Sequence, residues 1–511
     1  MAGLVWAGSA AAKASWTRAE TKHFIFYSSG KPAELEDFAI ETEKFDAMLR
    51  LRFNIPQDEI VNRLTIYVLP HGEDVATLKG VPKSGLEGFY QASAEGSFAV
   101  TNRDKPAGQY DGSGQQVLFH EYTHHFFARY LPNAYPVWLF EGFAEYYSTT
   151  TFKKDGTFTV GSPVWNRAYG LVEGKPMPIR DVLFKGLEGL DRAQTDIFYG
   201  RSWLLTHKLM SSPEGLKTLD SYIADLGHGL DPKEAAQKDF GDLDALDQAV
   251  EKEERTGLPM FVSKLPISFD PGYSAVELDD AQSRLVELQL QRRAQDDKHG
   301  ALEGLRALAA DYPDRPEILF ELAEAEYEVA RHGEEEAEKT GLAAADAAID
   351  RVLALDPKHV RANILKAQVM LDRKGPDATD DDFAASRKYL VKANRADPND
   401  PLPLYLYYRS YADIGVKPPA IALDGLSQSF ERAKEVVDFR VALAFALAGE
   451  GRFDEAIQLT GFLVNDPHGA AQGRQIMDEL LQMKQNFAKH EVDPADDADA
   501  PGGKEVTGKA G

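Results

Sequence analysis

The chain has 511 residues, of which 43% are hydrophobic, and this is more than one hydrophobic core supports. Its formal net charge of -25 argues against nucleic acid as a partner, because contacts to phosphates require a basic face. The chain contains no cysteine, so any metal site must be built from histidines and carboxylates. No stretch reaches the roughly 18 apolar residues of a membrane span, which predicts a soluble, multi-domain body.

The chain begins with the small and apolar residues MAGLVWAGSAAAKASW. Ala12-Lys13-Ala14 before Ser15 matches the small-x-small pattern at which signal peptides are cleaved. The basic segment that opens a signal peptide is missing, so either the true start lies upstream or this is an alanine-rich globular N-terminus. We expect residues 1–14 to be a signal-peptide remnant and the protein to be periplasmic or secreted from a bacterium.

The next part of the chain mixes strand and helix patterns. Short β-branched and aromatic runs occur at 23–30, 63–70 and 96–103, and an amphipathic stretch lies at 32–51. The glycine-rich segment GQYDGSG then leads into a helix from about Gln115 to Tyr130. This mixture predicts an α+β domain.

This helix contains the motif His120-Glu121-x-x-His124. On a helix the two histidines lie one turn apart on the same face, where both can bind one metal ion. Bound zinc lowers the pKa of its water, and Glu121 beside it can accept the proton as the water attacks a carbonyl. The flanking apolar residues indicate a buried helix, in which unpaired polar side chains would be unfavourable. The motif therefore predicts a hydrolytic metal site rather than a surface turn.

A third metal ligand is expected from a second helix. Pro132 and Pro136 end the first helix, and VWLFEGFAEYY then resumes helical spacing. Glu141 and Glu145 lie one turn apart on one face of this second helix. The spacing alone leaves either one as the ligand and the other as a partner to a ligand imidazole.

The pairing of HEYTHH with WLFEGFAEYY resembles the gluzincin metallopeptidases, in particular the bacterial peptidase MA-like family. The resemblance is tight over about 115–147 and looser over about 16–255. It implies a zincin-like fold for residues 15–260, Zn²⁺ as the cofactor, Glu141 as the third ligand and Glu145 as the partner of a ligand imidazole. Sixteen residues separate His124 from Glu141, slightly fewer than in the well-known aminopeptidases. The G-x-M-E-N motif of those aminopeptidases is also not visible, so aminopeptidase specificity is not expected.

The resemblance also extends to the segment DIFYGRSWLLTHKLM. Its beginning is similar to a Tyr-x-x-Ser segment found after the ligand glutamate in peptidase MA-like proteins. This likeness implies that Tyr199 donates a hydrogen bond to the oxyanion during catalysis. A packed aromatic side chain with a satisfied hydroxyl is the alternative interpretation.

From about residue 280 the pattern becomes almost purely helical. Breaks at Pro313, Pro357, Pro398 and Pro467 indicate repeats, and residues 441–467 closely resemble a tetratricopeptide repeat. We expect a linker at 261–280, tetratricopeptide-like repeats at 281–490 and a disordered acidic tail at 491–511. Such repeats bind proteins, so a polypeptide substrate or a protein partner is expected to contact them.

Taken together, these patterns predict a zinc metallopeptidase, most simply an endopeptidase, with helical repeats for protein binding. A non-catalytic tetratricopeptide scaffold with a zinc-binding pseudo-peptidase domain is the alternative. Intact Glu121 speaks against that alternative, because a domain without turnover is free to lose its general base. The motif also leaves open a zinc hydrolase that acts on bonds other than peptide bonds.

Overall fold

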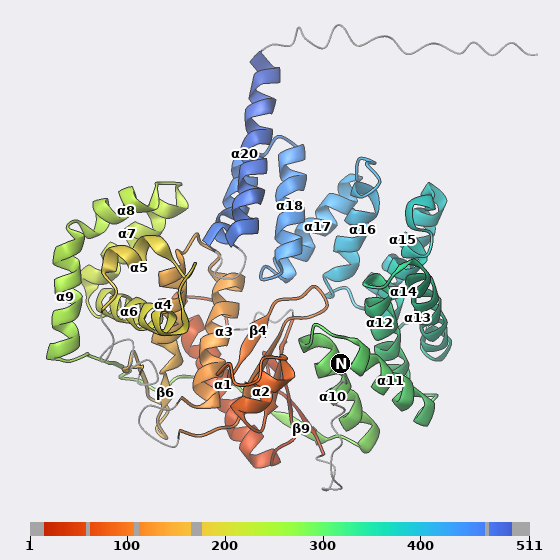
Figure 1. Ribbon diagram of the computed structural model, residues 1–511, viewed down its shortest axis with the longest axis horizontal. Coiled ribbons are helices and arrows are strands. Elements are labelled where there is room, and N and C mark those ends of the chain that lie inside the picture. The colour runs from red at the N-terminus through yellow and green to blue at the C-terminus, as the bar shows by residue number, and fades with distance from the viewer. Residues whose placement is uncertain (1–14, 58–61, 107–111, 165–175, 466–469, 493–511) are drawn as a thin grey trace, which may run out of the picture.

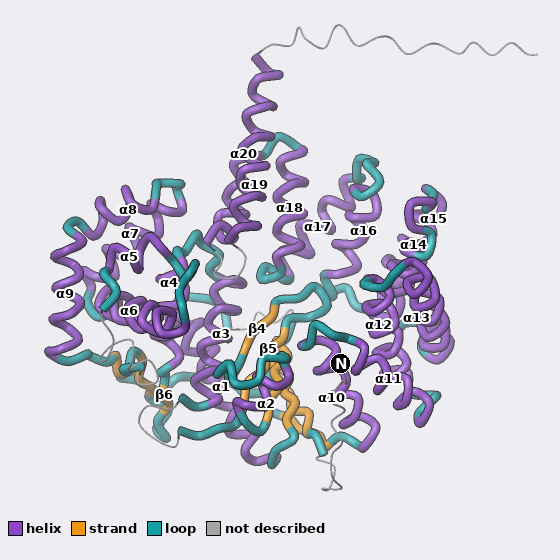
Figure 2. The backbone as a smooth tube through the Cα atoms, in the orientation of Figure 1, coloured by secondary structure: helices purple, strands orange, loops and turns teal. Residues whose placement is uncertain are grey.

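The computed structural model describes residues 15–57, 62–106, 112–164, 176–465 and 470–492. They form a unit of strands and helices, followed by an array of helices that arches over it (Figure 1). The expected signal-peptide remnant at 1–14 lies outside the described residues, and so does the expected tail from residue 493 onward. The predicted order of an α+β part before an all-α part is confirmed (Figure 2).

A six-stranded mixed sheet lies at the centre of the first part, in the order β4-β5-β3-β2-β1-β9. Its strands are β1 (Thr17–Glu20), β2 (Phe24–Ser28), β3 (Leu64–Leu69), β4 (Phe89–Gln91), β5 (Phe98–Asn102) and β9 (Ser274–Glu277). β2, β3 and β5 run parallel, whereas β1, β4 and β9 pair antiparallel with their neighbours. The strands predicted at 23–30, 63–70 and 96–103 are therefore confirmed.

Different helices cover the two faces of the sheet, because side chains alternate between the faces along each strand. Helices α1 (Pro32–Phe53) and α3 (Gly114–Tyr130) cover the face that carries Ile66 and Val68. Helices α2 (Gly72–Leu78) and α10 (Asp280–Ala294) cover the opposite face, which carries Tyr67 and Val100. The inner strands of the sheet are thus buried on both sides, whereas the edge strand β9 is exposed.

The structure differs from the predicted domain boundaries at the segment 261–280. Instead of a free linker, this segment contains β9, which pairs with β1 at the edge of the main sheet. It also contains β8 (Phe261–Val262), which extends a second sheet of β6 (Thr151–Phe152) and β7 (Phe158–Val160). These short strands form because they hydrogen-bond to strands that are distant in the sequence. The local sequence pattern therefore does not predict them.

Helices also follow the sheet in the first part of the chain. They are α4 (Val137–Ser148), α5 (Ile179–Lys185), α6 (Arg192–Met210), α7 (Pro213–Gly227), α8 (Pro232–Phe240) and α9 (Leu243–Thr256). α4 packs against both α3 and α6, so it lies between the sheet unit and the remaining helices. The helix predicted from VWLFEGFAEYY is confirmed as α4.

The second part of the chain is an array of helices in which each helix packs against the next. After α10 come α11 (His299–Asp311), α12 (Pro316–Arg331), α13 (Glu335–Leu355), α14 (Val360–Asp372), η3 (Gly375–Asp377), α15 (Asp380–Ala396), α16 (Leu402–Ala412), α17 (Ala420–Arg432), α18 (Val437–Gly449), α19 (Phe453–Thr460), η4 (Gly461–Asn465) and α20 (Ala470–Val492). In the unit predicted at 441–467, the second helix begins at Phe453 as expected. The helical hairpins predicted for 281–490 are therefore present.

The array contacts the first part of the chain at both of its ends. α10 buries Val286 and Leu290 against the main sheet, although the sequence assigned this helix to the repeats. At the other end, α17 and α18 approach the C-terminal end of α3 (Figure 1), and Phe462 of η4 contacts Phe140 of α4. Within the described residues, no helix is long and apolar enough to cross a membrane.

Leu290→Ala tests whether α10 is part of the core of the first unit. Leu290 is 3% exposed, so truncation should open a cavity under the sheet and lower the free energy of unfolding by about 2–5 kcal/mol. Leu355→Ala in α13 is the control, because this leucine is 50% exposed. Urea unfolding of both variants measures the difference, and equal stabilities would contradict the packing described for α10.

Candidate metal centre

Helix α3 is positioned by its N-terminal turn. The hydroxyl of Ser113 accepts a hydrogen bond from the backbone N–H of Gln116 and caps the helix. The next residue, Gly114, lies so close to β5 that a Cβ atom would stand 1.8 Å from the carbonyl oxygen of Asn102. This close approach fixes α3 against the end of a central strand and directs His120 and His124 toward α4.

Helix α4 brings the carboxylates. It begins after Pro136 and presents Glu141 and Glu145, both fully buried. Between them, Gly142 allows α4 to approach α6, since a Cβ atom there would stand 2.1 Å from the hydroxyl of Thr206. The glycine of the motif is therefore required by helix packing, and the same packing brings Tyr199 of α6 to the site.

Three donor atoms converge between α3 and α4. The Nε2 atoms of His120 and His124 lie 3.2 Å apart, and each lies 3.5 Å from Oε2 of Glu141. Ligands about 2.0–2.1 Å from a tetrahedral zinc ion stand about 3.3 Å from one another. Oε2 of Glu141 is buried and has no hydrogen-bond partner among the described residues. The spacing and the donor types therefore fit a zinc ion.

Without a metal, these groups perturb one another strongly. Burial lowers the pKa of His120, but the close contact with Glu141 and the charges of Glu145, Glu141 and Glu121 raise it to about 9 overall. Burial raises the pKa of Glu141, and the two imidazoles outweigh this effect and hold it well below its usual range. The carboxylate thus carries its charge in a buried position, where only a nearby cation compensates for the lost hydration.

Glu145 lies on the other side of His120. Its Oε1 atom is 3.6 Å from Nδ1 of His120, the ring nitrogen that faces away from Glu141. A carboxylate in this place orients the imidazole and makes its metal-binding nitrogen more basic. The structure therefore separates the two candidates that the spacing left open: Glu141 faces both histidines, and Glu145 faces the rear of one.

A cleft of about 350 Å³ opens onto the three donor atoms. Glu121 and Tyr199 both line it, and the ring centroids of Tyr199 and His120 are 6.5 Å apart. The opposite wall is formed by residues 85–90, which include the start of β4. Sequence reasoning did not single out Glu87, Tyr90, Gln116 and Ser148, which also line the cleft. Helical spacing from His120 and Glu145 could have found Gln116 and Ser148, whereas only tertiary packing brings Glu87 and Tyr90 to the site.

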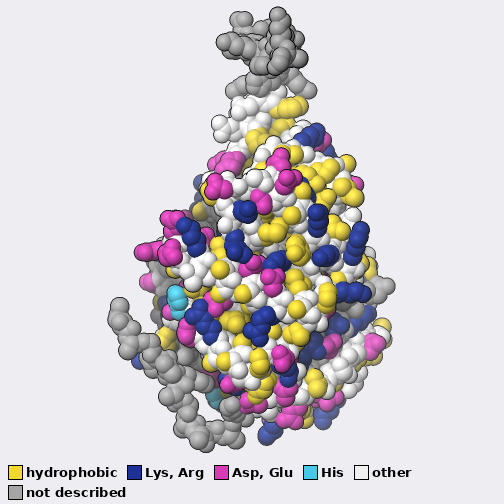
Figure 3. Space-filling view, turned by 90° about the vertical axis from the view of Figure 1, so that its right-hand side faces the viewer, with side chains coloured by type: hydrophobic (Ala, Val, Ile, Leu, Met, Phe, Trp, Pro, Cys, Tyr) yellow, Lys and Arg dark blue, Asp and Glu magenta, His cyan; other side chains and the backbone are white. Residues whose placement is uncertain are grey.

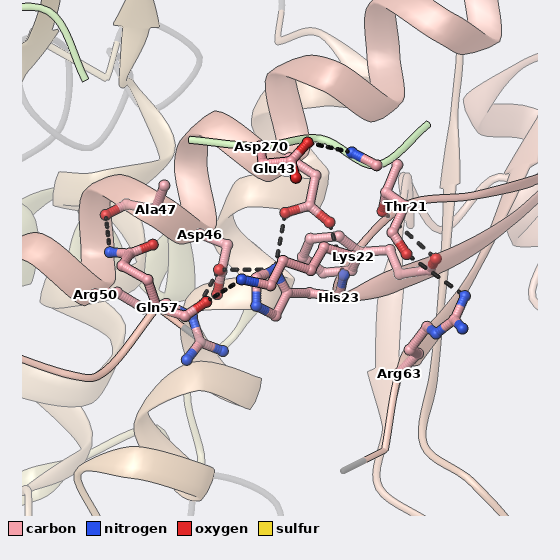
Figure 4. A network of polar contacts seen from close by, with 12 residues as sticks. Thr21, Lys22, His23, Glu43, Asp46, Ala47, Arg50, Gln57, Arg63 and Asp270 are labelled. Atoms are coloured by element: carbon pink, nitrogen blue, oxygen red, sulfur yellow. Dashed lines mark hydrogen bonds and ion pairs between the residues drawn. The ribbon is translucent and has the colours of Figure 1, made fainter. Parts of the chain in front are cut away.

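A buried polar network supports α3 from the side away from the cleft. The hydroxyl of Tyr122, between the two motif histidines, donates to Asp46 of α1 at 2.5 Å. Asp46 also accepts from Nε of Arg50 at 2.7 Å, and Glu43 lies 2.8 Å from Nδ1 of His23 (Figure 4). The network ties α3 to α1 and to the start of β2.

His23, Glu43 and Asp46 could also be considered as metal ligands, since their donor atoms lie within 4.8 Å of one another. However, Nδ1 of His23 already contacts both carboxylates, at 2.8 and 3.3 Å. Asp46 is paired with the buried guanidinium of Arg50, whose charge would repel a cation. The network is therefore structural.

Comparisons with known proteins concern the helical part of the chain. No family model matches the chain, and no curated protein sequence matches it. Among solved structures, TTC0263, a thermophilic TPR protein in Thermus thermophilus, is similar at 18% identity and a TM-score of 0.30, covering 42% of this chain and 99% of its own. MamA is similar at 14% identity and a TM-score of 0.26, with the same coverage. At such TM-scores the likeness says nothing more about this chain.

Asp46→Asn tests the network behind α3. The substitution removes the charge partner of buried Arg50 and should lower the free energy of unfolding by about 3–5 kcal/mol. Asp454→Asn is the matched control, because its ion pair with Lys484 is exposed and should contribute little. Thermal unfolding compares the two variants, and equal melting temperatures would show that the network does not stabilise α3.

Proposed function

We propose that this protein is a zinc-dependent metallopeptidase of the gluzincin kind, most simply an endopeptidase. The convergence of His120, His124 and Glu141 on one buried point, beside Glu121 at the cleft, carries this proposal. The likeness of their motif to peptidase MA-like proteins adds to it. A zincin-like fold for residues 15–260 belongs to the same proposal.

Each residue of the cleft has a defined part in the proposed mechanism. His120, His124 and Glu141 would hold zinc, which supplies a Lewis acid that polarises the scissile carbonyl and acidifies water. Glu121 takes the proton of the attacking water and returns it to the leaving nitrogen. Tyr199 donates to the oxygen that gains negative charge. Glu145 keeps the ring of His120 oriented.

The wall of the cleft supports a polypeptide substrate. β4 is the outermost strand of the main sheet, and Phe89 and Tyr90 of β4 line the cleft. The outer edge of such a strand can pair with an extended peptide through backbone hydrogen bonds. A peptide bound in this way would run past the three donor atoms.

A non-catalytic scaffold remains the second candidate. The helical array of residues 281–490 is compatible with protein binding in the absence of catalysis. In this alternative the zinc would be structural, and the helical repeats would bind a protein partner. For either candidate, the proposal includes export from a bacterial cytoplasm. A chain without cysteine suits an exported protein, because it has no thiol to oxidise.

Metal content tests the first half of the proposal. The purified chain should contain about one zinc ion, and a His120→Ala, His124→Ala double variant should contain none. Glu141→Ala should weaken zinc binding by more than Glu145→Ala, for which about a tenfold loss is expected of a group behind a ligand. Plasma mass spectrometry and competition with a chelator measure both. The reverse ranking of the two glutamates would show that the ligand assignment is wrong.

Turnover tests the second half. Glu121→Gln keeps the size and shape of the side chain but removes the base, so it should retain zinc and hydrolyse peptide bonds about 10²–10⁴-fold more slowly. Release of fluorescent peptides from labelled, unfolded casein measures the rate. Hydrolysis at the wild-type rate in this variant would contradict the mechanism, and zinc without any hydrolysis in the wild type would favour the scaffold.

A further inference from the structure

The turn between α17 and α18 is inserted against the C-terminal end of the metal-motif helix. Glu435 in this turn accepts a hydrogen bond from Nη1 of Arg129 at 2.9 Å, and both side chains are buried. The same guanidinium donates to the carbonyl oxygen of Arg432 at 2.9 Å. Arg129 lies five residues after the second motif histidine, in the last turn of α3. A buried ion pair therefore joins the repeats to this helix.

Arg440 of α18 makes a second contact to the same helix end. Its buried guanidinium donates to the carbonyl oxygen of Ala128 at 3.3 Å and to that of Lys434 at 2.7 Å. Carbonyl groups in the last turn of a helix lack partners within the helix and carry partial negative charge. The guanidinium of Arg440 thus provides a hydrogen-bond donor to a carbonyl group in the last turn of α3, and it holds the helix axis in place.

Aromatic contacts connect the repeats to a predicted metal ligand. The ring of His124 stacks on Phe140 of α4, with centroids 4.5 Å apart and planes at 29°. Phe140 also contacts the ring of Phe462 of η4, with centroids 5.8 Å apart in an edge-to-face arrangement. Phe462 therefore supports the ring against which the imidazole rests.

The same turn also contacts the segment that follows the opposite wall of the cleft. The hydroxyl of Ser97, directly before β5, donates to Glu435 at 3.5 Å. Tyr90 of β4 lines the cleft, and its hydroxyl lies 3.0 Å from Nδ1 of His125 on α3. The backbone of the loop between β4 and β5 accepts a hydrogen bond from Arg361 of α14, at Glu95. The loop that follows the opposite wall of the cleft thus also touches the array.

From these contacts we infer that the last repeats, residues 420–465, are a positioning element of the metal centre. Glu435 and Phe462 are positioning residues: Glu435 sets the end of α3 through Arg129, and Phe462 holds His124 through Phe140. Docking of the repeats and metal binding are therefore coupled, and a protein that displaces the repeats would loosen the site. The inference rests on the metal-binding part of the proposed function, not on turnover.

Phe462→Ala and Glu435→Gln in the full-length chain test this coupling. Each should lower zinc affinity by about tenfold, as is usual when a group that orients a ligand is removed. Each should also shift the visible absorption spectrum of the Co²⁺-substituted protein, because the imidazole of His124 or the axis of α3 changes direction. Phe462→Leu, which refills the space beside Phe140, should restore both the affinity and the spectrum.

Matched controls separate this effect from a general loss of stability. Glu321→Gln breaks another buried ion pair of the array, with Arg292, and Ile349→Ala truncates a fully buried side chain of α13, which lies outside residues 420–465. Both controls should keep wild-type zinc affinity and spectrum, even where they unfold at lower temperature. Equal zinc affinities in all variants, or equal losses of zinc affinity in the controls, would overturn this inference but leave the proposed function in place. A wild-type chain that takes up no zinc would overturn the proposed function as well.

Discussion

The buried carboxylate of Glu141 between two imidazoles is the constraint around which the first part of the chain is arranged. An ionised carboxylate loses its hydration when it is buried, and only nearby positive charge or hydrogen-bond donors compensate for that loss. The imidazoles of His120 and His124 stand 3.5 Å from its oxygen, and their own nitrogens face each other at 3.2 Å. Such a set is stable only when a proton or a metal ion is shared among the three.

The helix that carries the histidines is held on several sides. Its first turn meets a central strand at Gly114, and its rear face is tied to α1 through Tyr122 and Asp46. Its last turn receives Arg440 and the ion pair of Arg129 with Glu435. A metal centre needs ligands placed to within a fraction of an ångström, and rigid support of this kind limits how far the ligands can move.

The helical array takes part in this support. In many repeat proteins each unit contacts only its neighbours, so the array behaves as a separate elongated body. Here α10 fills one face of the main sheet, and the other end of the array packs on α3. The arch between these two anchors passes over β4 and β5 (Figures 1 and 2). The outer surface of the array, which carries mixed charged and apolar side chains in Figure 3, stays exposed.

Local patterns in the sequence were enough to predict the strands at 23–30, 63–70 and 96–103, the two helices of the metal motif and the helical repeats. The spacing of His120 and His124 predicts a shared face because one turn of helix is nearly four residues, and the run from Val137 to Ser148 continues the same periodicity. Repeat boundaries such as the helix start at Phe453 follow from turn residues. Each of these features is determined by residues that lie only a few positions apart in the sequence.

The spacing within α4 left Glu141 and Glu145 open, and only the resemblance favoured Glu141. The tertiary structure places Glu141 against both histidines and Glu145 behind His120. It also decided that residues 261–280 form edge strands rather than a linker, since their partners lie far earlier in the chain. The same holds for Phe462, which lies beside Phe140 although more than half of the chain separates them. Such contacts arise from how whole elements pack, and periodicity within one element carries no information about them.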